Sequence, residues 1–355
     1  MIKFIKLLSI LLNIRLYFLK PKKSKVLIYD KTSILFANTL FKSNYVTYDV
    51  RYESINLNIL FKTIVSKGFF NLKTEYKKLF FNTVEPKIVY TSIDNNLGFY
   101  KLKLIYPNAI YISDQNGIRN DVFYKKCLKH NKINKTKLQC DYFFTLGSIE
   151  KKRLSKIINA KIIIGGNTLN NFFPIKRNSK KKSIIFISSG NNQKFFNLDV
   201  DMFNHLIKFS KLNKFKLFYL ARPRVKLKPM FKETTNNNWK FVTSNRDRGK
   251  TYNTISKFGI VVFGHSTLGY EAMARGLRTV SLNHLLHNTQ EKKNHIEGPF
   301  WSEYKNYNDI ENIIFKTFNY SNRKWKTIYL KYSKKILFFD SKNKKKITLI
   351  NKILK

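Results

Sequence analysis

The hydrophobic positions of this chain fall into short runs that are separated by longer stretches of mixed polarity. In the first half the runs are residues 25–30, 45–50, 87–92, 109–113, 141–147 and 161–166, and in the second half they are residues 183–188, 216–221, 239–243, 259–263 and 279–283. Each run has the length of a buried strand, and most intervening stretches can hold a helix. Strands that alternate with helices form a parallel sheet covered on both faces. The pattern predicts an α/β protein with two Rossmann-like, doubly wound domains that face a cleft.

The boundary between the two series is a charged stretch without apolar residues, at positions 178–183. Such a stretch is typical of a linker between domains. The predicted domains are therefore residues 24–177 and 178–318. From about residue 308 the chain is basic and helical in pattern, and it predicts two helices that run to the C-terminus.

The first 23 residues carry a long apolar run that is interrupted by Lys3, Lys6 and Arg15. Their polar positions draw a narrow stripe on a helix, so residues 1–23 predict a basic amphipathic helix. Three interpretations remain open: an interfacial helix on an anionic membrane, a helix docked on the protein itself, and a single spanning anchor. The first predicts a cytoplasmic protein that is peripheral on the inner face of the bacterial membrane.

The formal net charge of +47 is extreme, and the lysines are spread along the whole chain. A polyanion partner is one interpretation. No arginine-rich patch or nucleic-acid motif accompanies the charge, so specific nucleic-acid binding is not expected. The two cysteines, Cys127 and Cys140, are too few for a metal cage and favour a reducing compartment.

The stretch Gly264-His265-Ser266-Thr267 ends a buried strand and leads directly into a helix with Glu271 in its second turn. Ser266 or Thr267 can be the N-cap, and the remaining N–H groups with the helix dipole favour an anion. Glu271 can accept bonds from ribose or sugar hydroxyls, and Gly276 is expected to end the helix. The alternative is an ordinary capped turn between a strand and a helix.

Two further loops after strands of the second half carry donors suited to phosphate. Arg222 and Arg224 follow the strand 216–221, and paired guanidinium groups suit a diphosphate. The loop 188–193, which contains Asn191, is rich in backbone and amide donors for a phosphate or a base. The alternatives are a basic surface turn and a plain turn. Asp199 and Asp201 match the D-x-D pattern of metal-dependent glycosyltransferases, but they precede a predicted helix and are interpreted as its N-cap.

Loops after strands of the first half carry candidate acid and base groups. Asp94 and Asp114 each follow a strand and are candidate general bases. Gln115, Asn116 and Arg119 can hold hydroxyls or a charged substrate, and Gly117 permits a tight turn. The alternative is the turn chemistry for which Asp-Gln-Asn-Gly is well suited.

With these loops identified, the chain resembles the bacterial surface-carbohydrate glycosyltransferases of the GT-B superfamily, which assemble capsule, lipopolysaccharide or O-antigen. The matching stretches span most of residues 87–305 and include TSIDNNLGFY, ISDQNGIRND, CDYFFTLGS, GGNTLNNFF, FGHSTLGYEAMARGLRTV and GPFW. The stretch from Ser266 to Gly276 is the most specific, although sugar-nucleotide epimerases of the same fold carry a looser version.

The resemblance implies roles for individual residues. Ser266 and Thr267, with Gly264, would lie at the donor phosphates, Glu271 at the ribose or sugar hydroxyls, and Arg222 and Arg224 nearby; Asn191 belongs to the same donor set. His265 is expected to contact the transferred sugar or merely to fill the loop. The first domain would supply the acceptor site, with Asp94, Asn95, Gln115 and Asn116. Residues 319–355 would cross back to the first domain. Some related families have a histidine at the position of Asn116, so the role of the base would be vacant in this chain or taken by Asp94 or Asp114.

The sequence therefore predicts a metal-independent glycosyltransferase without a cofactor, which moves a sugar from a nucleotide-sugar to a glycan or glycolipid acceptor. Removal of one contact to the leaving phosphate should cost about 10²-fold in turnover. Two alternatives remain: a sugar-nucleotide 2-epimerase of the same fold, and a non-enzymatic binder of anionic polymers.

Overall fold

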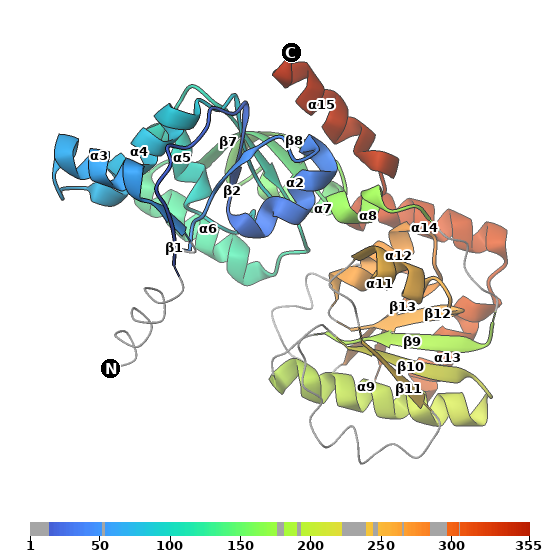
Figure 1. The fold of residues 1–355 in the computed structure, drawn as a ribbon. Helices are drawn as coiled ribbons and strands as arrows, with labels where there is room; N and C mark the ends of the chain where they lie inside the picture. Colours follow the sequence, from blue (N-terminus) through green and yellow to red (C-terminus); the bar gives the residue numbers. More distant parts are fainter. Residues whose placement is uncertain are drawn as a thin grey trace. The chain divides into compact units, whose positions relative to one another are not determined.

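The computed structural model describes residues 14–51, 54–175, 181–189, 193–221, 239–243, 248–264, 266–284, 297–304 and 306–355 (Figure 1). The chain divides into two compact units. Unit 1 contains Met1–Leu146, Glu150–Thr168 and Asp340–Lys355, and unit 2 contains Gly147–Ile149 and Leu169–Phe339. Each unit is organised around one six-stranded sheet.

The sheet of unit 1 has the strand order β3-β2-β5-β6-β7-β8, and all its pairs are parallel. Its strands are β2 (Val26–Tyr29), β3 (Val46–Tyr48), β5 (Ile88–Thr91), β6 (Ile110–Asp114), β7 (Leu138–Thr145) and β8 (Ile158–Ile164). The chain passes from β2 to β3 on one side and later to β5 on the other. The topological switch point of this unit therefore lies between β2 and β5.

Helices cover both faces of this sheet. They are α2 (Ile34–Phe41), α3 (Leu57–Lys67), α4 (Leu72–Val84), α5 (Leu102–Ile105), α6 (Asp121–Asn134), most of α7 (Ser148–Leu154), and α15 (Lys344–Leu354) at the end of the chain. Val26 and Ile28 of β2 pack in one cluster with Leu40 of α2 and Ile350 of α15. The alternate residue Leu27 packs with residues of α4 and α6 instead. Because successive side chains of a strand point to opposite faces, a continuous apolar run is needed here.

The sheet of unit 2 has the order β11-β10-β9-β12-β13-β14 and is also parallel throughout. Its strands are β9 (Ser183–Ile187), β10 (Lys216–Ala221), β11 (Trp239–Thr243), β12 (Ile260–Phe263), β13 (Thr279–His284) and β14 (Trp301–Tyr304). The helices are α8 (Thr168–Phe172), α9 (Gln193–Leu212), α11 (Arg248–Ile255), α12 (Thr267–Ala274), α13 (Tyr307–Asn319) and α14 (Asn322–Ile336). The prediction of two doubly wound, Rossmann-like parallel sheets is thus confirmed.

The prediction of one helix over residues 1–23 is wrong for its second half, and residues 1–13 lie outside the described residues. Arg15–Tyr17 form strand β1, which pairs in parallel with β4 (Ser54–Asn56), a strand that the pattern did not predict. The side chain of Asn56 also donates to the carbonyl of Leu19 at 2.7 Å. Pairing with a distant strand therefore overrides the local helical pattern. Within the described part of the chain, no helix has the length and apolarity to cross a membrane.

The C-terminal region holds three helices after residue 306, where the pattern predicted two. Helices α13 and α14 belong to unit 2, whereas α15 belongs to unit 1. Strand β14 was also not predicted, because Trp301–Tyr304 is a short run with two polar residues at its centre. The N-cap assigned to Asp199 is wrong as well, because α9 already begins at Gln193.

Candidate functional site

The switch point of unit 2 lies between β9 and β12, which pair in the middle of the sheet. Phe263 at the end of β12 pairs with Ile187 at the end of β9, so Ser188 and Ser189 follow directly beside Gly264. Ligands of open α/β sheets bind outside the carboxyl ends of the strands at such a point. The topology therefore selects the loops after β9 and β12 as the candidate site of this unit.

Gly264 lies close to two side chains of neighbouring segments. A Cβ atom at this position would lie 2.8 Å from Cε of Met202 and 3.1 Å from Oγ of Ser189. The residue has no positive φ angle, so its role is close approach and not an unusual turn. Glycine thus allows the ends of β9 and β12 to stay close together.

Asp199 holds the loop after β9 from inside helix α9. Its Oδ2 accepts hydrogen bonds from the hydroxyl of Ser188 at 3.0 Å and from the backbone N–H of Ser189 at 2.7 Å. Asp201 instead accepts from the hydroxyl of Tyr304 at 2.9 Å. The two carboxylates of the D-x-D sequence therefore have separate structural partners. Among the residues that the structure describes, no group of His, Cys, Asp and Glu could hold a metal ion.

Helix α12 begins where the sequence predicted, with Ser266 as its N-cap residue. The Ser266 side chain makes no capping hydrogen bond, and the N–H of Gly269 in the first turn donates to the carbonyl of Ser266 at 3.1 Å. At the other end Gly276 has φ +84°, and its N–H donates to the carbonyl of Met273. The N–H of Leu277 donates to Ala272. This Schellman motif confirms Gly276 as the residue that ends the helix.

Glu271 of α12 is almost completely buried and bonded to a tyrosine. Its Oε2 accepts from the hydroxyl of Tyr252 in α11 at 2.8 Å. No hydrogen bond to Oε1 occurs among the described residues, so this oxygen remains an acceptor. Burial and the neighbouring Glu271 carboxylate raise the pKa of Tyr252 well above its ordinary value, which keeps its hydroxyl protonated as a donor.

Arg275 extends this cluster by one turn of the helix. Its guanidinium lies 4.6 Å from the centre of the Tyr252 ring and donates to the carbonyls of Asn170, Phe173 and Pro174. Burial lowers the pKa of Arg275, although Tyr252 and Glu271 act in the opposite direction. Sequence reasoning did not identify Tyr252 or Arg275, because nothing in the local pattern indicates that α11 packs against Glu271.

Four residues of the predicted donor site lie outside the described residues: Asn191, Arg222, Arg224 and His265. Gly264, Ser266, Thr267 and Glu271 are described and belong to one strand-to-helix connection. The phosphate and hydroxyl contacts assigned to these residues stay predictions.

In unit 1, Asp94 is fully buried and lies in an ion pair with Arg119. Arg119 uses two nitrogens, with Nε 2.8 Å from Oδ2 of Asp94, and it also donates to the side chain of Asn116 at 2.7 Å. The structure thus brings together three of the residues predicted for the acceptor site. A paired carboxylate with no exposed surface can act as a base only after this ion pair opens.

Asp114 is also fully buried, and its partner lies near the end of the chain. Lys346 of α15 places Nζ 2.6 Å from Oδ1 of Asp114. Oδ2 accepts from the hydroxyl of Tyr90 at 2.9 Å and from Thr168. Burial lowers the pKa of Lys346, and the charge of Asp114 raises it. The arrangement is typical of a structural ion pair that attaches α15 to β6, a role that the sequence did not predict.

The remaining predicted acceptor residues differ in exposure. Gln115 is buried, and its side chain donates to Glu150 and accepts from the backbone of Leu146. Asn95 is exposed, and Asn116 and Gly117 are partly exposed. Asn95, Asn116 and Gly117 therefore offer accessible polar groups. The Gln115 side chain instead stabilises the loop, because it also donates to the carbonyl of Gly117 at 3.1 Å.

Residues 190–354 match a family model described as a putative O-antigen biosynthesis protein. No curated protein sequence matches the chain significantly.

Among solved structures, the chain is similar to the UDP-GlcNAc 2-epimerase of Methanocaldococcus jannaschii in complex with UDP-GlcNAc and UDP. The TM-score is 0.54 and the sequence identity is 12%, and the match covers 93% of this chain and 99% of the epimerase chain. HepE of Anabaena, in complex with UDP and glucose, has a TM-score of 0.53 and 10% identity, covering 93% and 99%. A glycosyltransferase of Rickettsia africae has a TM-score of 0.52 and 13% identity, covering 94% and 100%.

At these identities the solved structures establish the fold, which is that of GT-B proteins. The expected resemblance is confirmed in two parts, since the family model matches residues 190–354 and the solved structures match nearly the whole chain.

Proposed function

We propose that this protein is a nucleotide-sugar-dependent glycosyltransferase that acts in the assembly of a bacterial surface glycan, with its donor site at the β9–β12 switch point. The observation that carries the proposal is the meeting of Ser188, Ser189 and Gly264 at this point, directly before the N-terminus of α12. The positive end of the helix dipole favours a phosphate there. The match of residues 190–354 to an O-antigen biosynthesis model supports the process.

In this proposal each described donor residue has a separate role. Ser266 and Thr267 bind the phosphates, and Glu271 accepts hydroxyls through Oε1 while Tyr252 holds Oε2. Asn191, Arg222, Arg224 and His265, outside the described residues, complete the donor set. Preorganised donors stabilise the charge that develops on the leaving phosphate.

The acceptor is proposed to bind unit 1 beside Asn95, Asn116 and Arg119. The candidate bases are Asp94 and Asp114. Asp94 is the better placed of the two, because Asn95, beside it in the chain, is exposed and its partner Arg119 retains some exposure, whereas Asp114 and Lys346 have none. Arg119 would have to release Asp94 when the acceptor binds.

The test is an assay of sugar transfer from nucleotide-sugars to cell-envelope glycolipids, with wild type and Glu271→Gln. We expect Glu271→Gln to lower turnover by about 10²-fold, because a weaker acceptor replaces the carboxylate. Glu311→Gln is the matched control, because Glu311 accepts from Tyr307 at 3.0 Å in the same unit. Equal turnover in both variants would refute the donor site.

The second candidate is a sugar-nucleotide 2-epimerase, which the similarity to the Methanocaldococcus jannaschii enzyme favours. An epimerase needs no acceptor. Formation of an epimer from UDP-N-acetylglucosamine alone would therefore establish the second candidate and reject the first.

A further inference from the structure

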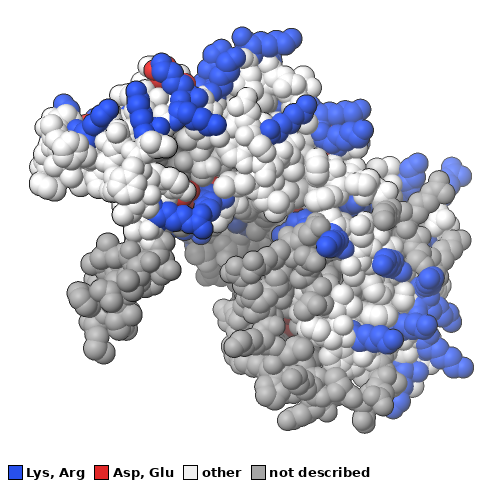
Figure 2. All heavy atoms as spheres, in the orientation of Figure 1, with Lys and Arg blue, Asp and Glu red and all other residues white. Residues whose placement is uncertain are grey.

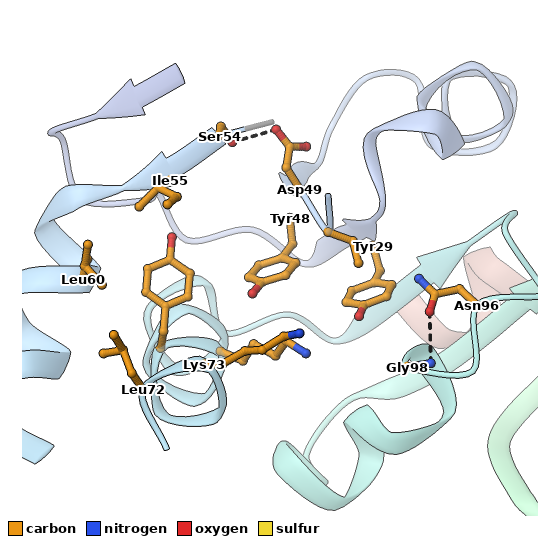
Figure 3. A pocket seen from close by; sticks show the side chains of 13 residues that line it. Tyr29, Tyr48, Asp49, Ser54, Ile55, Leu60, Leu72, Lys73, Asn96 and Gly98 are labelled. Carbon is orange, nitrogen blue, oxygen red and sulfur yellow. Dashed lines mark hydrogen bonds between the residues drawn. The ribbon is translucent and has the colours of Figure 1, made fainter. Parts of the chain in front are cut away.

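Unit 1 contains a pocket of about 470 Å³ beside the carboxyl ends of β2 and β3 (Figure 3). Most of its lining is aromatic or aliphatic: Tyr29, Tyr48, Val50, Ile55, Leu60, Leu72 and Tyr76. The rings of Tyr29 and Tyr48 stack in parallel, and their centroids are 5.8 Å apart. Burial raises the pKa of Tyr29 to about 12, so this ring stays uncharged. The lining therefore suits an apolar ligand.

A second pocket of about 660 Å³ adjoins the first and shares four lining residues with it: Tyr48, Asp49, Ser54 and Tyr76. Part of its lining is Leu16 and Tyr17 of β1 with Phe18 and Leu19 directly after the strand, and all four side chains are exposed. We call residues 16–19 the β1 segment. We call the two pockets together the unit 1 groove. Because the two pockets share these four residues, the unit 1 groove can take a longer ligand than either pocket alone.

One side of the unit 1 groove is basic. Lys73 and Lys77 stand one turn apart on α4, and Figure 3 shows the side chain of Lys73 extending toward Tyr29. Burial and the charge of Lys73 lower the pKa of Lys77. No ion pair of Lys77 occurs among the described residues. Lys73 is exposed and Lys77 is partly buried, and two neighbouring ammonium groups favour an anion.

The groove also offers a hydrogen-bond acceptor. Oδ2 of Asp49 accepts from the hydroxyl of Ser54 at 2.6 Å, whereas Oδ1 is buried and has no partner in the described part of the chain. A buried acceptor without a donor is costly, and a ligand hydroxyl would satisfy it. The polar side of the groove thus suits a head group with both an anion and hydroxyls.

Residues 61–70, from α3 through its link to α4, expose large apolar side chains next to this groove, and we call this segment the α3–α4 connection. Their exposed fractions are 69% for Phe61, 71% for Val65, 76% for Phe69 and 82% for Phe70. Phe61, Val65 and Phe69 are spaced by four residues, which places the first two on one face of α3. Lys62 and Lys67 are exposed beside them, and the surface over this part of unit 1 is mostly uncharged with basic groups at its edge (Figure 2). Aromatic side chains flanked by lysines are typical of contact with an anionic bilayer.

We propose that the unit 1 groove binds a single anionic lipid, with its apolar chain along Leu60, Leu72 and the β1 segment and its phosphate at Lys73 and Lys77, and that the α3–α4 connection rests on the bilayer that supplies it. This inference rests on the proposed function and names its acceptor class: a lipid that carries a phosphate and a hydroxylated head group. Neither the groove nor the lysine pair belongs to the acceptor residues predicted from the sequence.

The test is calorimetric binding of three probes to the full chain without nucleotide: farnesyl phosphate, farnesol and inorganic phosphate, each below its aggregation concentration. We expect farnesyl phosphate to bind at least about tenfold more tightly than farnesol, and inorganic phosphate to bind more weakly than either. The double variant Lys73→Gln/Lys77→Gln should lose that advantage and retain farnesol binding. The matched control is Lys125→Gln/Lys129→Gln, an exposed pair one turn apart on α6.

A second variant tests the apolar part. Leu60→Ser/Leu72→Ser should weaken both chain-bearing probes and leave the melting temperature close to that of wild type, because both side chains are only partly buried. Equal affinity for farnesyl phosphate and inorganic phosphate, or equal loss in the two lysine double variants, would overturn the proposal. Concentration-dependent dimerisation that is abolished by Phe69→Ser/Phe70→Ser would assign the exposed side chains to a second copy and overturn the bilayer contact.

The measurement needs no sugar donor. Its failure would leave the donor site of unit 2 standing, and a failed transfer assay with intact lipid binding would leave the unit 1 groove standing.

Discussion

At the scale of single residues, buried polar groups in this chain are paired across long sequence distances. Asp114 contacts Lys346, and Gln115 contacts Glu150. The polar residue at a strand end could be read from the sequence, because it follows an apolar run. Its partner could not, since a salt bridge between residues 232 positions apart leaves no local pattern. This is why Asp94 and Asp114 were predicted as bases although both are buried in ion pairs.

The Asp114–Lys346 pair gives a prediction about stability. Lys346→Met removes one partner and leaves a buried carboxylate uncompensated, which should cost about 3–5 kcal/mol in the free energy of unfolding. The double variant Asp114→Asn/Lys346→Met should recover part of this loss. Urea denaturation measures both, with Lys344→Met, an exposed neighbour on α15, as the control. Equal stability of Lys346→Met and the control would contradict a structural role of the pair.

Glu150 gives a prediction about pH. Burial raises the pKa of its carboxyl above the ordinary value of 4.5 and outweighs its bonds to Tyr124 and Gln115. The folded protein therefore holds this proton more tightly than the unfolded chain does, and this stabilising contribution disappears as pH rises from 4.5 through the folded-state pKa.

Glu150→Gln has no titrating group at this position. We expect the free energy of unfolding of wild type, relative to Glu150→Gln, to be lower at about pH 7 than at about pH 4. Urea titrations at the two pH values measure this difference, with the exposed acid variant Glu297→Gln as a control. A difference that is constant with pH would contradict the raised pKa.

At the scale of elements, the strands of both sheets were largely predictable, because a parallel strand buried on both faces is a continuous apolar run. Strands β1, β4 and β14 were not, since they are short and contain polar residues. The start of α9 was placed too late because Asp199 resembles an N-cap, whereas its side chain instead holds the loop after β9. Local capping preferences could not reveal this tertiary contact.

The close contact between β12 and α12 can be tested by a substitution that adds one methyl group at Gly269. A Cβ atom at Gly269 would lie 2.1 Å from Cγ of Phe263, so Gly269→Ala must separate the helix from the strand. We expect a loss of about 1–3 kcal/mol or more, measured by urea denaturation, from overpacking. Donor turnover should fall as well, because the N-terminus of α12 moves. Wild-type stability in Gly269→Ala would show that this connection does not require the close contact.

At the scale of the whole molecule, the chain is two Rossmann-like units, each with its own switch point at the carboxyl edge of a parallel sheet. The sequence predicted the two sheets and the loops that carry polar groups. It did not predict the unit 1 groove, because its lining comes from β1, β3, β4, α3 and α4, which are brought together only by the fold. We propose that the donor binds unit 2 and that a lipid-linked acceptor binds unit 1.

Hydrogen exchange of the full chain, followed by mass spectrometry with and without a panel of UDP-, GDP- and CMP-sugars, tests the donor assignment most directly. We expect at least one nucleotide-sugar to slow exchange in the peptide that spans Phe263–Glu271 and in the peptide that follows β9, because bound phosphate protects the backbone at the start of α12. Unit 1 peptides should be unchanged. Protection confined to unit 1, or no protection by any nucleotide-sugar at millimolar concentration, would contradict the central claim.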